Sequence, residues 1–551
     1  MRQLKAIISR LPLTELFTLM CVVSLGLSCT QKQSQSIIKV HRDTTITEVN
    51  AFTNLFLDSA LVADYVEQAQ LEDSLSLLIQ NFYNSRNYQM AWFTEDGAAE
   101  QTQAFYTLHQ QYIKESQDSS KLFPQQLQIE MAKLLFRDTL ITETSIPLAE
   151  IELQLTQQFL NYVSYAYTGT VDPEILKWHI PRKRVDAIAL LDSLVDRNGK
   201  DLEQWEPVSK PYTQLKKALL RLYEIEKNAV WEEISLGEAK KVEEGDSSEL
   251  VTQLKKKLMA TEDFPSEDTS ARFTPELTEA VKRYQRRMGL HDDGVVGKNV
   301  IKELNVPIKA RIEQILINME RMRWMPNIPE GNGILVNIPQ YELHVIEDGQ
   351  LAFQMDIVVG KTGSETVIFA DELKYVVFSP YWNVPSSIVR SEIYPAMKKN
   401  PNYLAEKNME QIGLSNGLPI IRQKPGNSNS LGRVKFMFPN SYNIYLHDTP
   451  SKSLFGAERR AFSHGCIRVS QPAKLAEYLL RNDKDWTSEK IAQAMRSNTE
   501  KWVALENPLP VFISYFTAWV DKDGLLNFRE DIYGHDQRMR ERLFGHSPQI
   551  Q

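Results

Sequence analysis

Cysteine is scarce in this chain of 551 residues: only three occur, at positions 21, 29 and 466. Three cysteines are far too few for the disulfide frameworks that hold small secreted domains together. An excess of basic residues is also lacking, because 63 Lys and Arg stand against 71 Asp and Glu. The chain therefore has no excess of positive charge with which to bind a phosphate backbone, and the sequence predicts no nucleic-acid partner.

The chain also has no apolar run near its N-terminus that is long enough to cross a bilayer. The run at residues 16–27 has twelve residues, whereas a transmembrane helix needs about 20. Basic residues precede it at positions 2, 5 and 10, which is the pattern of a secretion signal. We therefore expect a signal peptide over residues 1–28 and an exported protein.

The end of this signal, Gly26-Leu27-Ser28-Cys29, resembles a bacterial lipobox. The resemblance implies a lipoprotein at the periplasmic face of a bacterial membrane, tethered through a lipidated Cys29. An ordinary signal cut nearby and an uncleaved anchor are the alternatives. In the lipoprotein interpretation Cys466 is the only free thiol of the exported chain, and a lone thiol in an oxidising compartment calls for a chemical role.

The remaining chain divides into segments of different pattern, which together predict a multidomain α+β protein. Residues 29–55 are polar and predict a tether. Apolar positions three and four apart predict a helical scaffold domain over residues 56–245, followed by a small three-helix module over residues 246–307. Short alternating runs predict a β-rich domain over residues 331–498, and residues 499–551 predict a C-terminal β-hairpin extension that packs on it.

The three-helix module has recognisable helix boundaries. A helix is expected to start at Thr274-Pro275 and to end at Gly289. Together with Tyr284-Gln285, the string Asp293-Gly294-Val295-Val296-Gly297 resembles the peptidoglycan-binding type 1 domain. The resemblance implies affinity for the bacterial cell wall.

The densest chemical signal lies in Tyr445-Leu446-His447-Asp448 and in Ser463-His464-Gly465-Cys466-Ile467-Arg468, with fifteen residues between His447 and Ser463. A cysteine nucleophile needs a base for its proton and cations that favour the thiolate, and His447 and Arg468 can supply both. Gly465 permits a tight turn that points the Cys466 N–H at a developing oxyanion.

These two strings resemble the signature of the L,D-transpeptidase (YkuD-like) family, and the order of the predicted domains is similar to that of its large periplasmic subgroup. The resemblance implies that Cys466 is the nucleophile and His447 the general base, oriented by the backbone carbonyl of Asp448. It also implies that Tyr445 and the Cys466 N–H line the oxyanion hole. Further residues that shape the site are Ser463, His464, Gly465 and Arg468.

The reaction implied by the resemblance is acyl transfer on peptidoglycan stem peptides, without cofactor or metal. Cys466 attacks the third stem residue, D-alanine leaves, and an amine of a second stem resolves the thioester into a cross-link. Carbapenem-type β-lactams are the implied inhibitors. Resolution by water would instead give an L,D-carboxypeptidase or a peptidoglycan-editing hydrolase. A non-catalytic wall-binding lipoprotein is the alternative from another class.

Two further points concern single residues of the signature. His464 either packs under the nucleophile turn or takes part in proton transfer, and the sequence leaves both open. A zinc site made of His447, His464 and Cys466 is not expected, because the His-Gly-Cys spacing is too tight for the usual loops and no fourth ligand is evident.

A polar, partly helical insertion interrupts the β-rich domain at residues 386–430. It is longer than a connection between two strands requires, and long segments of this kind are usually functional or disordered. We predict a cap over the substrate, with Arg390 and Tyr394 as substrate-binding residues; a solvated excursion is the alternative. Phe436 and Asn440, which lie in the family-like string, are predicted to bind substrate as well.

Overall fold

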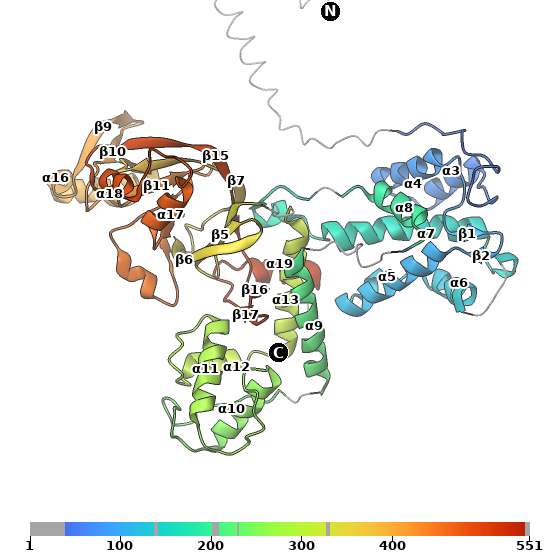
Figure 1. The fold of residues 1–551 in the computed structure, drawn as a ribbon, viewed down its shortest axis with the longest axis horizontal. Coiled ribbons are helices and arrows are strands. Elements are labelled where there is room, and N and C mark those ends of the chain that lie inside the picture. Colours follow the sequence, from blue (N-terminus) through green and yellow to red (C-terminus); the bar gives the residue numbers. More distant parts are fainter. Residues whose placement is uncertain are drawn as a thin grey trace, which may run out of the picture. The chain divides into compact units, whose positions relative to one another are not determined.

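The structure, a computed structural model, describes residues 39–136, 141–183, 185–200, 209–228, 231–326 and 331–545 (Figure 1). The predicted signal and Cys29 lie outside the described residues. Among the helices that are described, none is long and apolar enough to cross a membrane. The chain divides into two compact units, the first made of residues 1–99 and 125–157 and the second of residues 100–124 and 158–551.

The first unit is mostly helical, as the sequence predicts. Its elements are α3 (Ser59–Gln68), α4 (Asp73–Ser85), the hairpin β1 (Phe93–Thr94) and β2 (Gly97–Ala98), α6 (Gln125–Phe136), η2 (Ile141–Glu143) and the first part of α7 (Leu148–Val163). The described part of the expected tether is not free: the backbone N–H of Val40 donates to Asn81 Oδ1 at 2.8 Å, and Asn87 Nδ2 donates to the Ile46 carbonyl at 2.7 Å. This segment is therefore held against α4.

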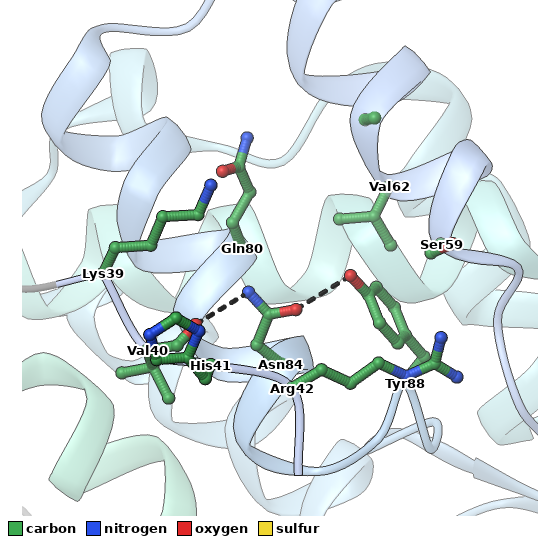
Figure 2. A pocket seen from close by; sticks show the side chains of 10 residues that line it. Lys39, Val40, His41, Arg42, Ser59, Val62, Gln80, Asn84 and Tyr88 are labelled. Carbon is green, nitrogen blue, oxygen red and sulfur yellow. Dashed lines mark hydrogen bonds between the residues drawn. The ribbon is translucent and has the colours of Figure 1, made fainter. Parts of the chain in front are cut away.

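A hollow of about 330 Å³ lies beside the same segment (Figure 2). Its lining includes Lys39, His41 and Arg42, and Asn84 is hydrogen bonded to Tyr88 within it. The hollow contains none of the residues that the sequence predicts to be catalytic.

The second unit contains the rest of the predicted helical scaffold. Its helical elements up to residue 228 are α5 (Glu100–Ser116), η1 (Ser119–Lys121), the end of α7, η3 (Ser164–Thr168), η4 (Pro173–Leu176), α8 (Ala187–Asp196) and α9 (Lys210–Asn228). A short strand, β3 (Trp178–His179), pairs with the sheet of the β-rich domain. The scaffold thus contributes a strand to the sheet that follows it in sequence.

The three-helix module is formed as predicted, by α10 (Glu249–Ala260), α11 (Pro275–Met288) and α12 (Lys298–Leu304). Thr274 caps α11 through its hydroxyl, and Gly289 ends the helix with a positive φ of 70°. Gln285 on α11 fixes the glycine-rich turn: its amide nitrogen donates to Asp293 Oδ1 and its oxygen accepts from the Gly294 N–H, both at 2.8 Å. The family-like string is therefore a structural unit of this module.

α13 (Ile308–Trp324) leads into the β-rich domain, whose strands close on themselves. The order β11-β12-β14-β6-β5-β4-β15-β7 is completed by pairing of β7 with β11, so the sheet forms a barrel around a large apolar core. The strands are β4 (Gly333–Asn337), β5 (Glu342–Glu347), β6 (Gln350–Gly360), β7 (Ile368–Phe378), β11 (Val434–Met437), β12 (Leu446–His447), β14 (Ile467–Val469) and β15 (Lys501–Ser514). β13 (Ala461–Ser463) pairs with β6, and α17 (Pro472–Leu479) and α18 (Ser488–Arg496) precede β15.

The prediction of a separate C-terminal extension is wrong for residues 501–514. These residues form β15, which lies between β4 and β7 and belongs to the barrel. The predicted hairpin exists as β16 (Ala518–Val520) and β17 (Leu526–Phe528), but Ala518 and Phe528 belong to the apolar cluster that contains the three-helix module. A further helix, α19 (His535–Leu543), follows it.

The insertion has more structure than the sequence pattern suggests. It contains α14 (Ser386–Ile388), η6 (Val389–Ile393), α15 (Tyr394–Lys399) and α16 (Tyr403–Glu406), and a three-stranded sheet in which β10 (Leu418–Gln423) lies between β8 (Trp382–Asn383) and β9 (Met409–Ser415). Val389, Ile393 and Ile421 form a small apolar core of its own. Because β7 ends at Phe378 and β11 starts at the paired Val434, the insertion leaves and re-enters the barrel at one point.

Candidate active site

Two short parallel strands carry the predicted catalytic residues. β12 and β14 pair so that Leu446 lies opposite Ile467 and His447 opposite Arg468. Successive side chains of a strand point to opposite faces. Leu446 and Ile467 are fully buried in the barrel core, so His447 and Arg468 share the outer face. Tyr445 lies two residues before His447 and Cys466 two residues before Arg468, so both project to that same face.

His447 is a buried, neutral imidazole with a defined tautomer. Its Nδ1 lies 2.5 Å from the backbone carbonyl oxygen of Asp448, which can only accept, so Nδ1 carries the proton and Nε2 is free to accept one. Burial lowers the pKa of His447 from 6.5 to about 3, and the positive charge of Arg468 acts in the same direction. At neutral pH the residue is therefore ready to act as a base.

The residue whose carbonyl orients His447 is held in place by its side chain. The Asp448 carboxylate accepts hydrogen bonds from the Arg433 N–H at 2.8 Å and from Lys452 Nζ at 2.6 Å. Gly432 has a φ of 63°, and a Cβ at this position would lie 2.4 Å from the Asp448 carboxyl carbon. Only glycine permits this close approach, so the orientation of His447 depends on Gly432, fifteen positions before it.

Cys466 is a free, half-buried thiol at the start of β14. Its Sγ donates to the backbone carbonyl of Asn443 at 3.6 Å. Burial raises the pKa of the Cys466 thiol above its usual range, and hydrogen bonds from Tyr445 together with the charges of Lys435 and Arg468 oppose that effect. The resting sulfur is therefore protonated, and a base is needed to generate the nucleophile.

The turn before Cys466 is fixed by hydrogen bonds to its backbone. Gly465 has a φ of 116°, which favours glycine. Ser463 Oγ donates to the Cys466 carbonyl at 2.6 Å and accepts from the Gly465 N–H at 3.2 Å. Thr366, which the sequence analysis did not identify, donates through Oγ1 to the Gly465 carbonyl at 2.7 Å. Ser463 and Thr366 therefore position the turn.

His464 connects the turn before Cys466 to the insertion. Its Nε2 lies 3.0 Å from Glu392 Oε1 on η6. Arg390, predicted to bind substrate, is exposed on the same η6 element. Tyr394 instead packs within the insertion, half-buried against its small core and with Lys398 Nζ at 4.5 Å from its ring centre. The insertion thus lies beside the nucleophile turn.

The prediction that Phe436 binds substrate is wrong. Phe436 pairs with Leu446 across β11 and β12 and is fully buried in the core, on the opposite face from Cys466. Asn440 shapes the loop whose Asn443 carbonyl accepts from Cys466 Sγ, because its amide donates to the carbonyls of Phe438 and Ile444 and its oxygen accepts from the Ile444 N–H. Substrate binding by Asn440 stays a prediction.

Lys435 is a site residue that the sequence analysis missed. It lies opposite His447 on β11, and its Nζ is 4.4 Å from the centre of the Tyr445 ring. The side chain is half-buried, and burial lowers the pKa of Lys435. The signal was the alternation Val434-Lys435-Phe436, in which a charged residue separates two core positions, but that pattern alone also fits a solvated strand face.

No group of three or more His, Cys, Asp and Glu side chains that could hold a metal ion occurs among the described residues.

Three segments of the chain match family models. Residues 331–491 match the model described as "L,D-transpeptidase catalytic domain", residues 77–219 match "Scaffold domain", and residues 247–304 match "Putative peptidoglycan binding domain". A curated protein of Haemophilus influenzae named "Putative L,D-transpeptidase" is 34% identical over 243 residues, which are 41% of this chain and 49% of that protein. The chain thus spans about half the length of the curated relative it matches.

Solved structures of L,D-transpeptidases superpose only weakly on this chain. An L,D-transpeptidase from Stackebrandtia nassauensis is 18% identical, with 50% of this chain and 94% of that chain covered and a TM-score of 0.21. L,D-transpeptidase 3 from Mycobacterium tuberculosis, in complex with a faropenem-derived adduct, is 15% identical, with 33% and 60% covered and a TM-score of 0.18. At these TM-scores the superpositions support no conclusion about this chain.

The assignment therefore rests on the segment matches, which agree with the three domains expected from the sequence. The chain contains an L,D-transpeptidase catalytic domain of the YkuD type, joined to a scaffold domain and a peptidoglycan-binding domain.

Proposed function

We propose that the protein is an L,D-transpeptidase that cross-links peptidoglycan stem peptides through a thioester on Cys466 and releases D-alanine. The observation that carries the proposal is the register of β12 and β14, which puts the Cys466 thiol and the free Nε2 of His447 on one face. The curated relative and the catalytic-domain match support the same reaction class.

In the acylation step, His447 Nε2 takes the thiol proton as Cys466 Sγ attacks the carbonyl carbon of the third stem residue. The oxyanion that forms faces the Cys466 N–H and Tyr445. Collapse breaks the C–N bond, and His447 returns the proton to the amine of the departing D-alanine. Since burial holds the pKa of His447 low and that of the thiol high, we expect proton transfer and attack to be coupled.

In the second step, the side-chain amine of another stem attacks the thioester carbonyl. A C–N bond forms, the C–S bond breaks, and the proton released by the amine passes through His447 to the sulfur. The thiol is regenerated without an external energy source, because the thioester retains the free energy of the cleaved bond. Arg468 shares the outer face with His447 and places a positive charge beside the site that attracts a carboxylate of either stem.

The cellular setting is part of the proposal. We infer an exported lipoprotein, tethered through Cys29 at the periplasmic face of the membrane, with the peptidoglycan-binding domain holding it to the wall. The supports are the lipobox-like stretch and the match at residues 247–304. We also infer that carbapenem-type β-lactams acylate Cys466, because a strained lactam carbonyl offers the same attack without a leaving amine.

The test is incubation of the full-length protein with disaccharide tetrapeptides, followed by mass spectrometry of the products. Cross-linked dimer plus free D-alanine is expected, and Cys466→Ala should give neither. A product mixture that contains tripeptide without dimer would assign the protein to the hydrolases instead. Treatment with a carbapenem should add one acyl group, located on the peptide that contains Cys466; an adduct elsewhere would count against an activated thiol.

A further inference from the structure

The face that carries the catalytic residues continues across the barrel to β15. Lys435 lies opposite His447 on one side and opposite Val377 of β7 on the other, and Val377 in turn lies opposite Trp502 of β15. Paired residues of neighbouring strands project to the same face. Trp502 therefore shares the outer face with His447, although it lies beyond residues 331–491 and outside the matched catalytic domain.

Trp502 forms a fixed aromatic pair with Tyr375, two residues before Val377 on β7. The two rings meet edge to face, with centres 5.8 Å apart and planes at 71°. The indole N–H donates to Glu500 Oε2 at 3.0 Å, and Glu500 Oε1 accepts from the Tyr381 N–H at the root of the insertion. The side chain is nevertheless 51% exposed. An indole that is held in orientation and still half open to solvent is preorganised for stacking.

The aromatic pair lies within reach of such a substrate. The Trp502 ring centre is 6.0 Å from Lys435 Nζ, which is 4.4 Å from the centre of the Tyr445 ring, so the Trp502 and Tyr445 rings lie at most about 10 Å apart. Tyr445 is hydrogen bonded to Cys466, and about 10 Å is the length of about three extended residues. A donor stem that is attacked at its third residue has two further residues and a linker before its sugar, so the sugar would lie near the aromatic pair.

We propose that Trp502 and Tyr375 form a saccharide subsite, which stacks on a sugar ring of the glycan strand that carries the donor stem. This inference rests on the proposed function, because it takes the third residue of the donor stem to be attacked by Cys466. A pyranose ring presents an apolar C–H face that complements an exposed indole. Lys435 lies between the Trp502 and Tyr445 rings, with its Nζ 6.0 Å from the first ring centre and 4.4 Å from the second. It offers a cation to a carboxylate of the stem between sugar and thiol.

The subsite can be tested by protection of Cys466 from alkylation, which reports ligand only at the active site and not at the peptidoglycan-binding domain. The ligands are tripeptide products with and without the disaccharide, which have no D-alanine to lose. For each, the concentration that halves the rate of Cys466 alkylation by iodoacetamide is measured in the full-length protein. We expect the disaccharide to lower this concentration, and Trp502→Ala to reduce that advantage roughly five- to tenfold.

Two variants accompany the measurement. Trp502→Phe should retain part of the advantage, because a smaller ring still stacks. Phe544→Ala removes another exposed aromatic side chain, at the end of α19, and should leave the ratio of the two concentrations unchanged. Thermal unfolding of each variant shows whether the fold is retained, and Trp502 is exposed enough for its replacement to be tolerated.

The outcomes separate the subsite from the proposed function. Protection by both ligands with the same ratio in the protein and in Trp502→Ala would overturn the saccharide subsite and leave the transpeptidase proposal standing. Protection by neither ligand would overturn both. Sugar-dependent protection that requires Trp502, in a protein that forms no cross-linked dimer, would confirm the subsite and refute transpeptidation.

Discussion

Replacement of Lys435 by methionine is the most direct probe of the electrostatics around the nucleophile. Methionine keeps most of the aliphatic contact with the Tyr445 ring and removes the charge. Lys435 is among the groups that oppose the burial-induced rise in the pKa of Cys466. Without the ammonium, burial is opposed less, so the thiol pKa should rise further and less thiolate should be present at a given pH.

The size of the effect follows from the strand spacing. Lys435 and Cys466 lie on β11 and β14, with β12 between them, which corresponds to a separation of roughly 10 Å. Two unit charges at that distance interact by about 1.7 kcal/mol at an effective dielectric constant of about 20. Salt at about 0.15 M screens part of this. A thiolate that is less stabilised is also more nucleophilic, which offsets about half of the remainder on a logarithmic scale.

The assay is the rate of Cys466 alkylation by iodoacetamide as a function of pH, with the modified peptide quantified by mass spectrometry. For Lys435→Met we expect the profile to move to higher pH and the rate below its midpoint to fall roughly threefold. Lowering the salt concentration should widen the difference between the two proteins. The assay needs no peptidoglycan substrate, so it remains informative whatever the acceptor is.

Two control variants make this result specific. Lys435→Arg keeps the charge and should restore most of the rate. Lys374→Met removes a lysine of the adjacent β7 that pairs with Glu372 at 3.5 Å and is 44% exposed, and should not move the profile. Superimposable profiles for Lys435→Met and the unmodified protein would refute the electrostatic role.

Four further outcomes are expected. Cys466→Ala and His447→Ala should each abolish cross-linking, and the double variant should be no worse, because the two residues act as a unit; more than a few per cent of activity in either would refute the assignment. The pKa of His447 is lowered to about 3 in the folded protein, so the unfolded chain binds the extra proton first as the pH falls below 6.5. Between about pH 6.5 and pH 3, the free energy of unfolding should therefore fall by up to about 5 kcal/mol more than it does in His447→Gln, as measured by urea unfolding. Gly432→Ala should slow thiol acylation by a carbapenem at least tenfold in protein that is still folded, because its methyl group would displace Asp448 and with it the carbonyl that orients His447; the melting temperature should also fall, since a side chain is strained at a φ of 63°, and an unchanged rate would show that the carbonyl is not needed. Shortening the insertion at residues 386–430 should raise the ratio of tripeptide to dimer, because an acceptor stem needs a positioning surface and water does not; an unchanged ratio would leave the insertion without a catalytic role.

The sequence predicted the turn before Cys466 and the histidine beside it because short strings of residues specify both. The Ser-His-Gly-Cys run and the His-Asp pair each specify their own backbone geometry, and the structure adds the register that brings them together. The same strings misled the assignment of Phe436, since membership in a motif does not say which face of the strand a residue occupies. That information comes from the neighbours, here Leu446 and Val376.

The residues that sequence reasoning missed all depend on pairing between distant segments. Lys435 becomes a site residue only when β11 lies beside β12, and Trp502 only when β15 lies beside β7. The run from Val511 onward looks like the first arm of a hairpin, because its apolar residues continue without a break into the true hairpin strand at Ala518. Pairing of Ile513 with Val336, across more than 170 residues, leaves no local trace.

The C-terminal segment connects the nucleophile turn with the peptidoglycan-binding domain. Tyr533 donates through its hydroxyl to the Gly360 carbonyl at 2.5 Å and accepts from the Thr366 N–H, and Thr366 in turn holds the Gly465 carbonyl. At its other end, Arg529 donates to the Arg287 carbonyl of α11 at 2.7 Å. The backbone before Cys466 is therefore supported by residues outside the matched catalytic domain, and a chain that ended at residue 491 would lack the Tyr533 hydroxyl that holds Gly360 and Thr366.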